Sequence, residues 1–111
     1  MSIHTKKDIL NYLEEQYDDF KKVYNVKKIG VFGSFARDEA TDNSDVDIFV
    51  DMKPNLFNLI AIKNKIENNL KRRVDIVREH KNIKPMLLKM IKKDLIYVGW
   101  KYRVNPLNFR I

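Results

Sequence analysis

The sequence predicts an α/β or α+β domain in which a small mixed sheet of three or four strands is flanked by helices. Segments with apolar residues at helical spacing alternate along the chain with short segments rich in β-branched and aromatic residues. The chain has 111 residues, which is enough to bury one core. The first two strand-like segments are separated by a short connection, which favours antiparallel pairing and hence a mixed sheet.

Three long helices are predicted, over residues 5–23, 56–72 and 84–95. The first begins at Thr5, and Asp8 follows at the spacing of a capping box. The third has Pro85 in its first turn, where proline is tolerated. The apolar faces of the first two helices comprise Ile9, Leu13, Tyr17, Phe20, Tyr24, Leu59, Ile62, Ile66 and Leu70. A shorter helix of one or two turns is predicted over residues 35–40.

Three strands are predicted over residues 26–33, 44–52 and 73–78, and residues 96–98 either extend the last helix or form a fourth strand. We expect residues 1–99 to form the domain and residues 100–111 to form a C-terminal tail. The tail is aromatic and basic, a composition that suits either a partner interface or packing against the domain. Its apolar residues include Trp100, Tyr102, Leu107 and Phe109.

Composition and charge narrow the function. The chain contains no cysteine, which excludes disulfides and zinc–thiolate sites and fits a reducing cytoplasm. We see neither a signal peptide nor an apolar stretch long enough to span a bilayer, so the expected location is cytoplasmic and away from membranes. The net charge of +7 is uneven, with −4 in residues 1–52 and +11 in residues 53–111. This asymmetry suggests an anionic partner, although most of the lysines suit solvated helix faces.

The most informative stretch reads GVFGSFARDEATDNSDVDIFVD, residues 30–51. Side chains alternate in a strand, so Asp45 and Asp47 should point the same way, about 7 Å apart, while the apolar residues between and after them face the core. Two like charges at this range repel by roughly 1 kcal/mol or more. A divalent cation would offset the repulsion, because one or two carboxylates together with substrate phosphates commonly hold Mg²⁺.

A third carboxylate occurs in a similar setting. Asp75 lies between Val74 and Ile76, and it joins the other two aspartates on one face if strands two and three are neighbours. Three carboxylates on a sheet could hold two metal ions about 4 Å apart. The alternative for Asp75 alone is an ion pair with Arg72 or Arg73.

Gly33 and Ser34 stand where a strand turns into a short helix. Glycine allows a tight turn and close backbone approach, and the first N–H groups of a helix attract phosphate. Ser34 adds a hydroxyl donor. Arg37 follows one turn later and could contact phosphate or pair with an acidic neighbour.

These residues resemble the signature of the nucleotidyltransferase superfamily that includes DNA polymerase beta: an apolar strand ending in Gly-Ser, then Asp-x-Asp flanked by apolar residues. The short chain and the form GSFAR…SDVDIFVD are similar to its minimal nucleotidyltransferase (MNT) branch, whose members are typically encoded beside a HEPN-domain ribonuclease toxin. The resemblance covers about residues 25–98 and implies a nucleotidyltransferase fold.

The resemblance further implies that Gly33 and Ser34 hold the triphosphate of ATP, and that Asp45 and Asp47 bind Mg²⁺. Asp75 matches the third carboxylate, a metal ligand and base for the acceptor hydroxyl. The implied reaction is transfer of AMP to a tyrosine of a cognate HEPN toxin, which neutralises it, so that the chain acts as an antitoxin. One position departs from the pattern, because Asp38 stands where many members have glycine.

Three alternatives remain open. A non-catalytic antitoxin would mask the toxin instead of modifying it. A small-molecule nucleotidyltransferase usually carries a second domain to hold the acceptor, for which this chain has little room. Direct nucleic-acid binding through the basic half is not expected, because no stacking or groove-reading motif is evident.

Overall fold

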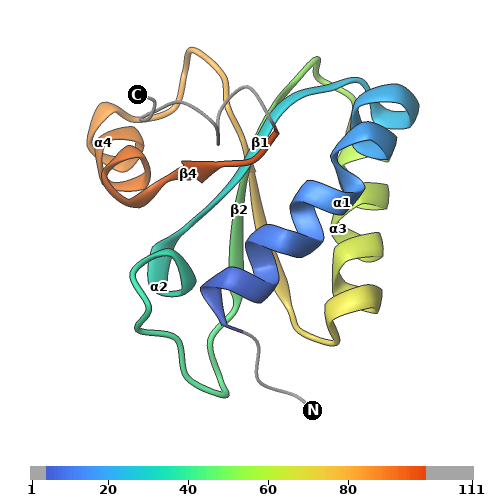
Figure 1. The fold of residues 1–111 in the computed structure, drawn as a ribbon. Helices are drawn as coiled ribbons and strands as arrows, with labels where there is room; N and C mark the ends of the chain where they lie inside the picture. Colours follow the sequence, from blue (N-terminus) through green and yellow to red (C-terminus); the bar gives the residue numbers. More distant parts are fainter. Residues whose placement is uncertain (1–4, 100–111) are drawn as a thin grey trace, which may run out of the picture.

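The computed structural model describes residues 5–99, so the predicted tail lies outside the described residues, as do residues 1–4. Eight elements follow one another along the chain (Figure 1). They are α1 (Lys6–Tyr24), β1 (Val26–Phe32), α2 (Gly33–Ala36), β2 (Val46–Met52), α3 (Leu56–Leu70), β3 (Val74–Arg78), α4 (Pro85–Asp94) and β4 (Ile96–Tyr97). None of the helices in this part of the chain is both long enough and apolar enough to cross a membrane.

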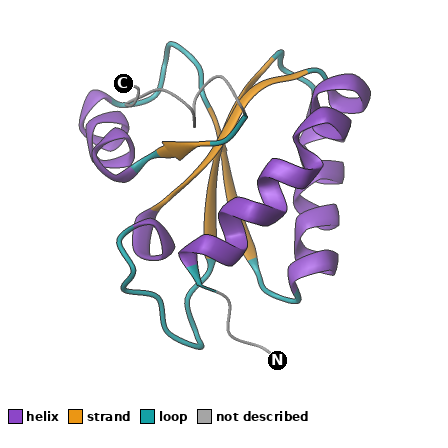
Figure 2. Cartoon of the chain, viewed as in Figure 1, coloured by secondary structure: helices purple, strands orange, loops and turns teal. Residues whose placement is uncertain are grey.

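The four strands form one mixed sheet in the order β3-β2-β1-β4 (Figure 2). β1 pairs antiparallel with β2 and with β4, whereas β2 and β3 are parallel and are joined through α3. The predicted mixed sheet and the antiparallel pairing of the first two strands are therefore confirmed. Residues 96–97 form the short edge strand β4, which decides between the two predictions for that segment.

The core lies between one face of the sheet and helices α1 and α3, which run side by side across it (Figure 1). The predicted capping box starts α1, since the Asp8 amide donates to Thr5 Oγ1 at 3.1 Å and the Thr5 amide donates to the Asp8 carboxylate at 3.1 Å. The strands contribute fully buried side chains at alternating positions. Those on this face include Ile29, Val31, Val46, Ile48 and Val50.

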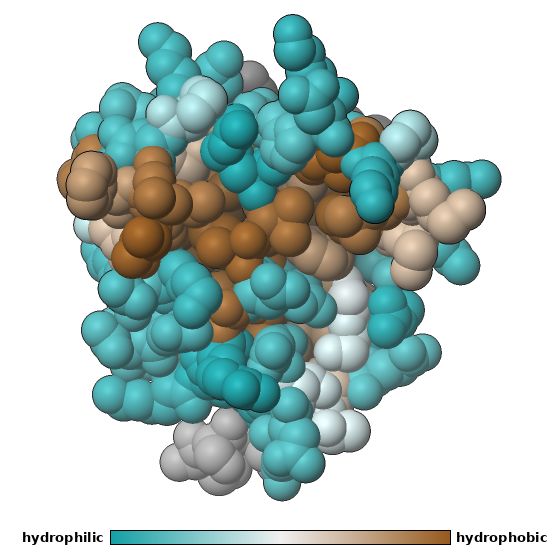
Figure 3. Space-filling model, turned by 180° about the vertical axis from the view of Figure 1, so that it is seen from behind, coloured by the Kyte–Doolittle hydropathy of each residue, from teal (hydrophilic) through white to brown (hydrophobic). Residues whose placement is uncertain are grey.

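Among the described residues, α4 covers part of the opposite face of the sheet. Phe32 and Phe49 meet edge to face on this side, with ring centroids 6.3 Å apart. Ile91 is the buried residue of α4, whereas Met86, Leu87 and Met90 on the same helix are exposed. Figure 3, seen from behind, shows apolar atoms gathered in a band across the molecule. The sheet therefore has one face for the core and another on which side chains remain accessible.

The predicted short helix over residues 35–40 is wrong in its position. The helix α2 is a single turn, Gly33–Ala36, and it begins directly at the end of β1. It cannot continue because Asp38 has a φ of 60°, in the left-handed region that ends helices. The other predicted elements differ from the observed ones by one or two residues at their ends, where helices and strands fray.

Candidate active site

Strand pairing brings two of the predicted site residues, Asp47 and Asp75, into one row across the sheet. Asp47 of β2 pairs with Asp75 of the parallel strand β3, and with Phe32, the last residue of β1, on its other side. Paired residues on adjacent strands lie about 4.8 Å apart and face the same side. The expectation that strands two and three are neighbours is confirmed, and it places Asp47 and Asp75 together beside Gly33.

The surroundings of the Asp47 carboxylate disfavour its ionised form. Burial, together with the nearby charges of Asp75 and Asp45, raises the pKa of Asp47 to about 6, while the Arg37 guanidinium acts in the opposite direction. A carboxyl group of this kind titrates near neutrality when no cation is bound. Asp75 and Asp45 therefore lie close enough to Asp47 to disfavour its ionised form.

Gly33 allows the chain to approach this carboxylate. Its φ is 75°, which most side chains avoid, and a Cβ at this position would overlap the Asp47 carboxylate. Ser34 follows it and is partly exposed. Glycine is thus required here for both its conformation and its size, and the Gly-Ser turn lies directly against the aspartate row.

Arg37 pairs with acidic neighbours, the second of the two possibilities open from the sequence. Its Nε lies 2.9 Å from Glu39 Oε1 and its Nη1 lies 2.7 Å from Asp94 Oδ2. These hydrogen bonds raise the pKa of Arg37 further above its usual value. Asp94 ends α4 and is distant in sequence, so no local pattern could have identified it as a partner of Arg37.

A pocket of about 370 Å³ opens between α4 and the start of α2. Phe32, Leu87, Met90 and Ile91 provide apolar walls, while charged groups lie at the rim. Its full lining is Phe32, Gly33, Arg37, Leu87, Met90, Ile91, Lys93 and Asp94. Because Gly33 borders both the pocket and Asp47, one ligand could contact the apolar walls and the aspartate row together. The sequence predicted α4 but not that it faces the site.

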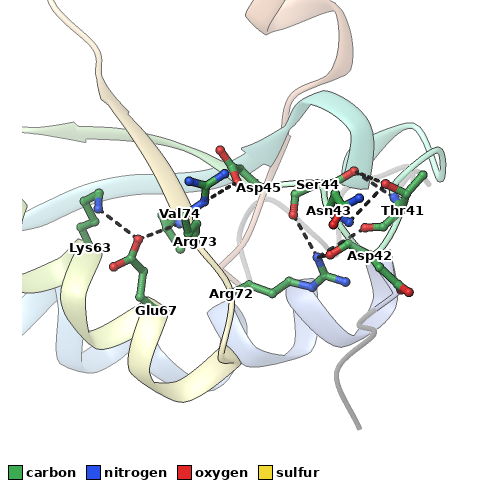
Figure 4. A network of polar contacts seen from close by, with 10 residues as sticks. All are labelled: Thr41, Asp42, Asn43, Ser44, Asp45, Lys63, Glu67, Arg72, Arg73 and Val74. Carbon is green, nitrogen blue, oxygen red and sulfur yellow. Dashed lines mark hydrogen bonds and ion pairs between the residues drawn. The ribbon is translucent and has the colours of Figure 1, made fainter.

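Asp45, the remaining predicted aspartate, immediately precedes β2 and contacts the exposed Arg73. The Arg73 Nε lies 3.3 Å from Asp45 Oδ1 (Figure 4). Asp75 is exposed. Within residues 5–99, no three His, Asp or Glu side chains are arranged closely enough to enclose a metal ion. The three-carboxylate metal site therefore remains a prediction. The donor set itself suits Mg²⁺, which takes a few carboxylate oxygens and completes its shell with water or phosphate oxygens.

Asp38, where the sequence departs from the nucleotidyltransferase pattern, has a structural explanation. Its positive φ is a conformation that glycine adopts without strain and that aspartate tolerates better than most residues. Its carboxylate is 64% exposed and lies 3.1 Å from Lys6 Nζ. The charge is thus directed to a lysine of α1, which lessens its conflict with a triphosphate.

A mixed sheet with a Gly-Ser turn against paired aspartates is the arrangement that the resemblance to nucleotidyltransferases implied. Residues 8–98 match the family model of the nucleotidyltransferase domain, and the chain belongs to this family. The prediction of a nucleotidyltransferase resembling the minimal branch is thereby confirmed at the level of family and fold.

Several named proteins are similar to this chain in sequence or in fold. The protein adenylyltransferase MntA of Thermococcus cleftensis is 34% identical over 100 residues, covering 88% of this chain and all of that protein. A Methanocaldococcus jannaschii protein, provisionally named a protein adenylyltransferase, is 36% identical over 96 residues, covering 85% of this chain and 98% of its own. A solved structure that is provisionally named a minimal nucleotidyltransferase superposes with a TM-score of 0.70 at 28% identity, covering 86% of this chain and 98% of that one. A toxin–antitoxin structure with AMP-PNP shares the fold, with a TM-score of 0.61 at 19% identity, over 76% of this chain and 70% of that one.

Proposed function

We propose that this chain transfers AMP from ATP to a tyrosine hydroxyl of a cognate HEPN ribonuclease toxin and so acts as its antitoxin. The observation that carries the proposal is the aspartate row beside Gly33, in a chain whose relatives include a protein adenylyltransferase. In the reaction, the acceptor oxygen bonds to the α-phosphorus of ATP as the bond to pyrophosphate breaks. The proton of the acceptor hydroxyl passes to Asp75.

The carboxylates act through cation binding. Two Mg²⁺ ions held by Asp45, Asp47 and Asp75 would neutralise the triphosphate and polarise the reacting oxygens. The raised pKa of Asp47 supports this role, because a site whose carboxylates repel one another without a cation gains most when a cation binds. The Arg73 side chain pairs with Asp45 from the solvent side and is free to move away, being 83% exposed.

ATP would lie across Gly33. Its triphosphate would sit against the Gly33–Ser34 turn, where backbone N–H groups are available, and Arg37 would contact it from the rim. Its adenosine end would enter the adjoining pocket, whose apolar walls suit the faces of a purine and whose volume suits a nucleoside. Arg37 is already oriented at this rim by Glu39 and Asp94.

The acceptor must come from a partner, since this small domain offers little surface of its own to orient a hydroxyl. Alignment of the reacting groups supplies much of the rate in such transfers. Most of the large apolar side chains that the described residues expose lie on two helices, which suits association with another protein. They are Leu56, Phe57 and Ile60 on α3 and Met86, Leu87 and Met90 on α4, and Val23 on α1 is a further one.

The test is the intact mass of the partner toxin after incubation with the chain, ATP and Mg²⁺. We expect the toxin to gain the mass of one or a few AMP groups, with tyrosine as the modified residue. The double variant Asp45→Asn/Asp47→Asn keeps the size of both side chains and should abolish the transfer. Unchanged transfer by a folded double variant would disprove the proposed site, and EDTA should stop the reaction if metal is required.

A masking antitoxin is the second candidate, favoured by the exposed apolar side chains just described. It predicts that the double aspartate variant still binds the toxin and still protects cells that express it. Loss of protection with binding retained would instead establish that catalysis is what neutralises the toxin.

A further inference from the structure

The loop that leads into Asp45 is a compact turn whose shape is set by its own side chains. The Thr41 amide donates to Ser44 Oγ at 2.9 Å, and the Ser44 amide donates to the Thr41 carbonyl at 3.1 Å. The Asn43 amide donates to Thr41 Oγ1 at 3.3 Å. The turn directs several backbone carbonyls toward a single side chain, Arg72 (Figure 4).

The Arg72 guanidinium donates hydrogen bonds to backbone carbonyls of this turn. Its Nη1 lies 2.9 Å from the carbonyl oxygen of Ser44 and at longer distances, 3.3 and 3.4 Å, from those of Asp42 and Thr41. The Ser44 carbonyl belongs to the peptide group that joins Ser44 to Asp45. The strongest of these contacts therefore acts directly on the backbone that carries the first aspartate.

The same guanidinium also contacts the other half of the site. Its Cζ lies 5.0 Å from the centre of the Phe35 ring, a cation–π arrangement. Phe35 is buried and comes directly after the Gly33–Ser34 turn. One side chain thus touches both the helix that follows the glycine turn and the loop that precedes the aspartate strand.

The backbone of Arg72 is itself fixed between two elements. Lys71 ends α3 in the left-handed conformation, with a φ of 58°, and its amide donates to the Glu67 carbonyl. The Arg73 carbonyl accepts the Val46 amide at 2.9 Å, where β2 and β3 begin to pair. Arg72 can therefore act as a rigid support, since neither end of its short segment can move freely.

We propose that Arg72 is a positioning residue that fixes Asp45 and Asp47 relative to the Gly33–Ser34 turn, without itself touching nucleotide or metal. The inference rests on the proposed function of these aspartates.

The test compares Arg72→Lys with Arg78→Lys. Lysine keeps the charge of Arg72 but lacks the planar group that can stack on Phe35 while donating to several carbonyls. Arg78 is a matched control because it also donates to backbone carbonyls, those of Met52 and Glu79, from the opposite end of β3. Each variant is measured for thermal stability, for hydrogen exchange over residues 41–47, and for calorimetric binding of Mg²⁺ with a non-hydrolysable ATP analogue.

We expect Arg72→Lys to weaken binding of the magnesium–analogue complex by about 10- to 100-fold, the usual effect of losing a support behind metal ligands. Amide exchange over residues 41–47 should accelerate, and AMP transfer should need correspondingly more Mg²⁺ for half-maximal rate. Arg78→Lys should leave the binding affinity, the exchange over residues 41–47 and the Mg²⁺ requirement as in the unsubstituted chain.

A general structural role predicts a different result. If Arg72→Lys and Arg78→Lys lower the melting temperature equally and neither changes binding or exchange over residues 41–47, the positioning role is overturned. Should the unsubstituted chain bind the magnesium–analogue complex but transfer no AMP, the proposed function fails, while the binding and exchange measurements still decide the role of Arg72.

Discussion

At Asp47, burial and the neighbouring negative charges both disfavour the ionised carboxylate. Its pKa of about 6 in the folded chain exceeds its value of 3.8 without the fold, so the folded state binds the proton more tightly. Stability then falls as the pH rises between these two values, and the ionised carboxylate destabilises the metal-free chain above them. We expect Asp47→Asn to raise the free energy of unfolding at neutral pH and to remove this part of the pH dependence, as measured by urea denaturation across the range.

Asp51→Asn is the matched control, because it removes a carboxylate from the same face of β2 outside the aspartate row; Asp51 lies 4.0 Å from Lys28. Magnesium with the ATP analogue should reverse the ranking, since a ligand stabilises only the chain that binds it. Identical pH profiles for Asp47→Asn and the unsubstituted chain would contradict the electrostatic account of this residue.

The positive φ of Asp38 leads to a second prediction. A left-handed conformation costs most residues about 1–2 kcal/mol, and glycine is spared. Asp38→Ala should therefore lower the free energy of unfolding by about 1 kcal/mol. Asp38→Gly should change it by no more than a few tenths of a kcal/mol, because relief of strain offsets the loss of an exposed ion pair.

Chemical denaturation of both variants and of Lys6→Ala separates the contribution of the backbone conformation to stability from that of the ion pair. Lys6→Ala removes the ion pair alone. If the alanine and glycine variants at position 38 lost equal stability, and both matched Lys6→Ala, the backbone explanation would be excluded.

Among the elements, α4 offers the clearest test of the pocket. Leu87 lines the pocket, whereas Met86, its neighbour on the same helix, does not. Both are exposed, at 47% and 76%, so a polar replacement of either should cost little stability. We expect Leu87→Ser to raise the KM for ATP several-fold through lost apolar contact with the base, and Met86→Ser to leave it unchanged, as measured in AMP-transfer kinetics.

Equal effects of the two substitutions on the KM for ATP would place the nucleoside elsewhere. A fall in kcat at unchanged KM for both would instead indicate that this part of α4 contacts the protein acceptor.

The strands could be predicted from sequence because their apolar alternation is strong. Asp47 and Asp75 each occupy the second position of a strand, so parallel pairing of β2 and β3 was enough to align them. The position of α2 could not be predicted, because it depends on the positive φ values of Gly33 and Asp38. The pairing of Arg37 with Asp94 joins segments that no local pattern connects.

For the molecule as a whole, the site takes charged groups of both signs from both halves of the sequence. The half with a balance of −4 carries Asp45, Asp47 and Arg37, and the half with +11 carries Asp75, Asp94 and Arg73. Because Arg73 of the basic half pairs with Asp45 of the acidic half, the charge asymmetry does not by itself require a nucleic-acid partner.

We therefore expect only weak, non-specific binding of single-stranded RNA, with a dissociation constant no tighter than about 10⁻⁶ M at physiological salt. Fluorescence anisotropy with a labelled oligonucleotide at several salt concentrations measures this. Tight binding with a steep salt dependence would show that the basic half has a nucleic-acid partner after all.

The row formed by Phe32, Asp47 and Asp75 runs across the strands rather than along them. The separation of the two backbone positions that carry its carboxylates is therefore set by the repeat of the sheet, about 4.8 Å, and not by the length of a loop. The segment between α2 and β2 can lengthen or shorten during evolution while this spacing stays the same. Loops around the site could therefore change to accept a different acceptor substrate, because the spacing of the aspartate-bearing strands does not depend on them.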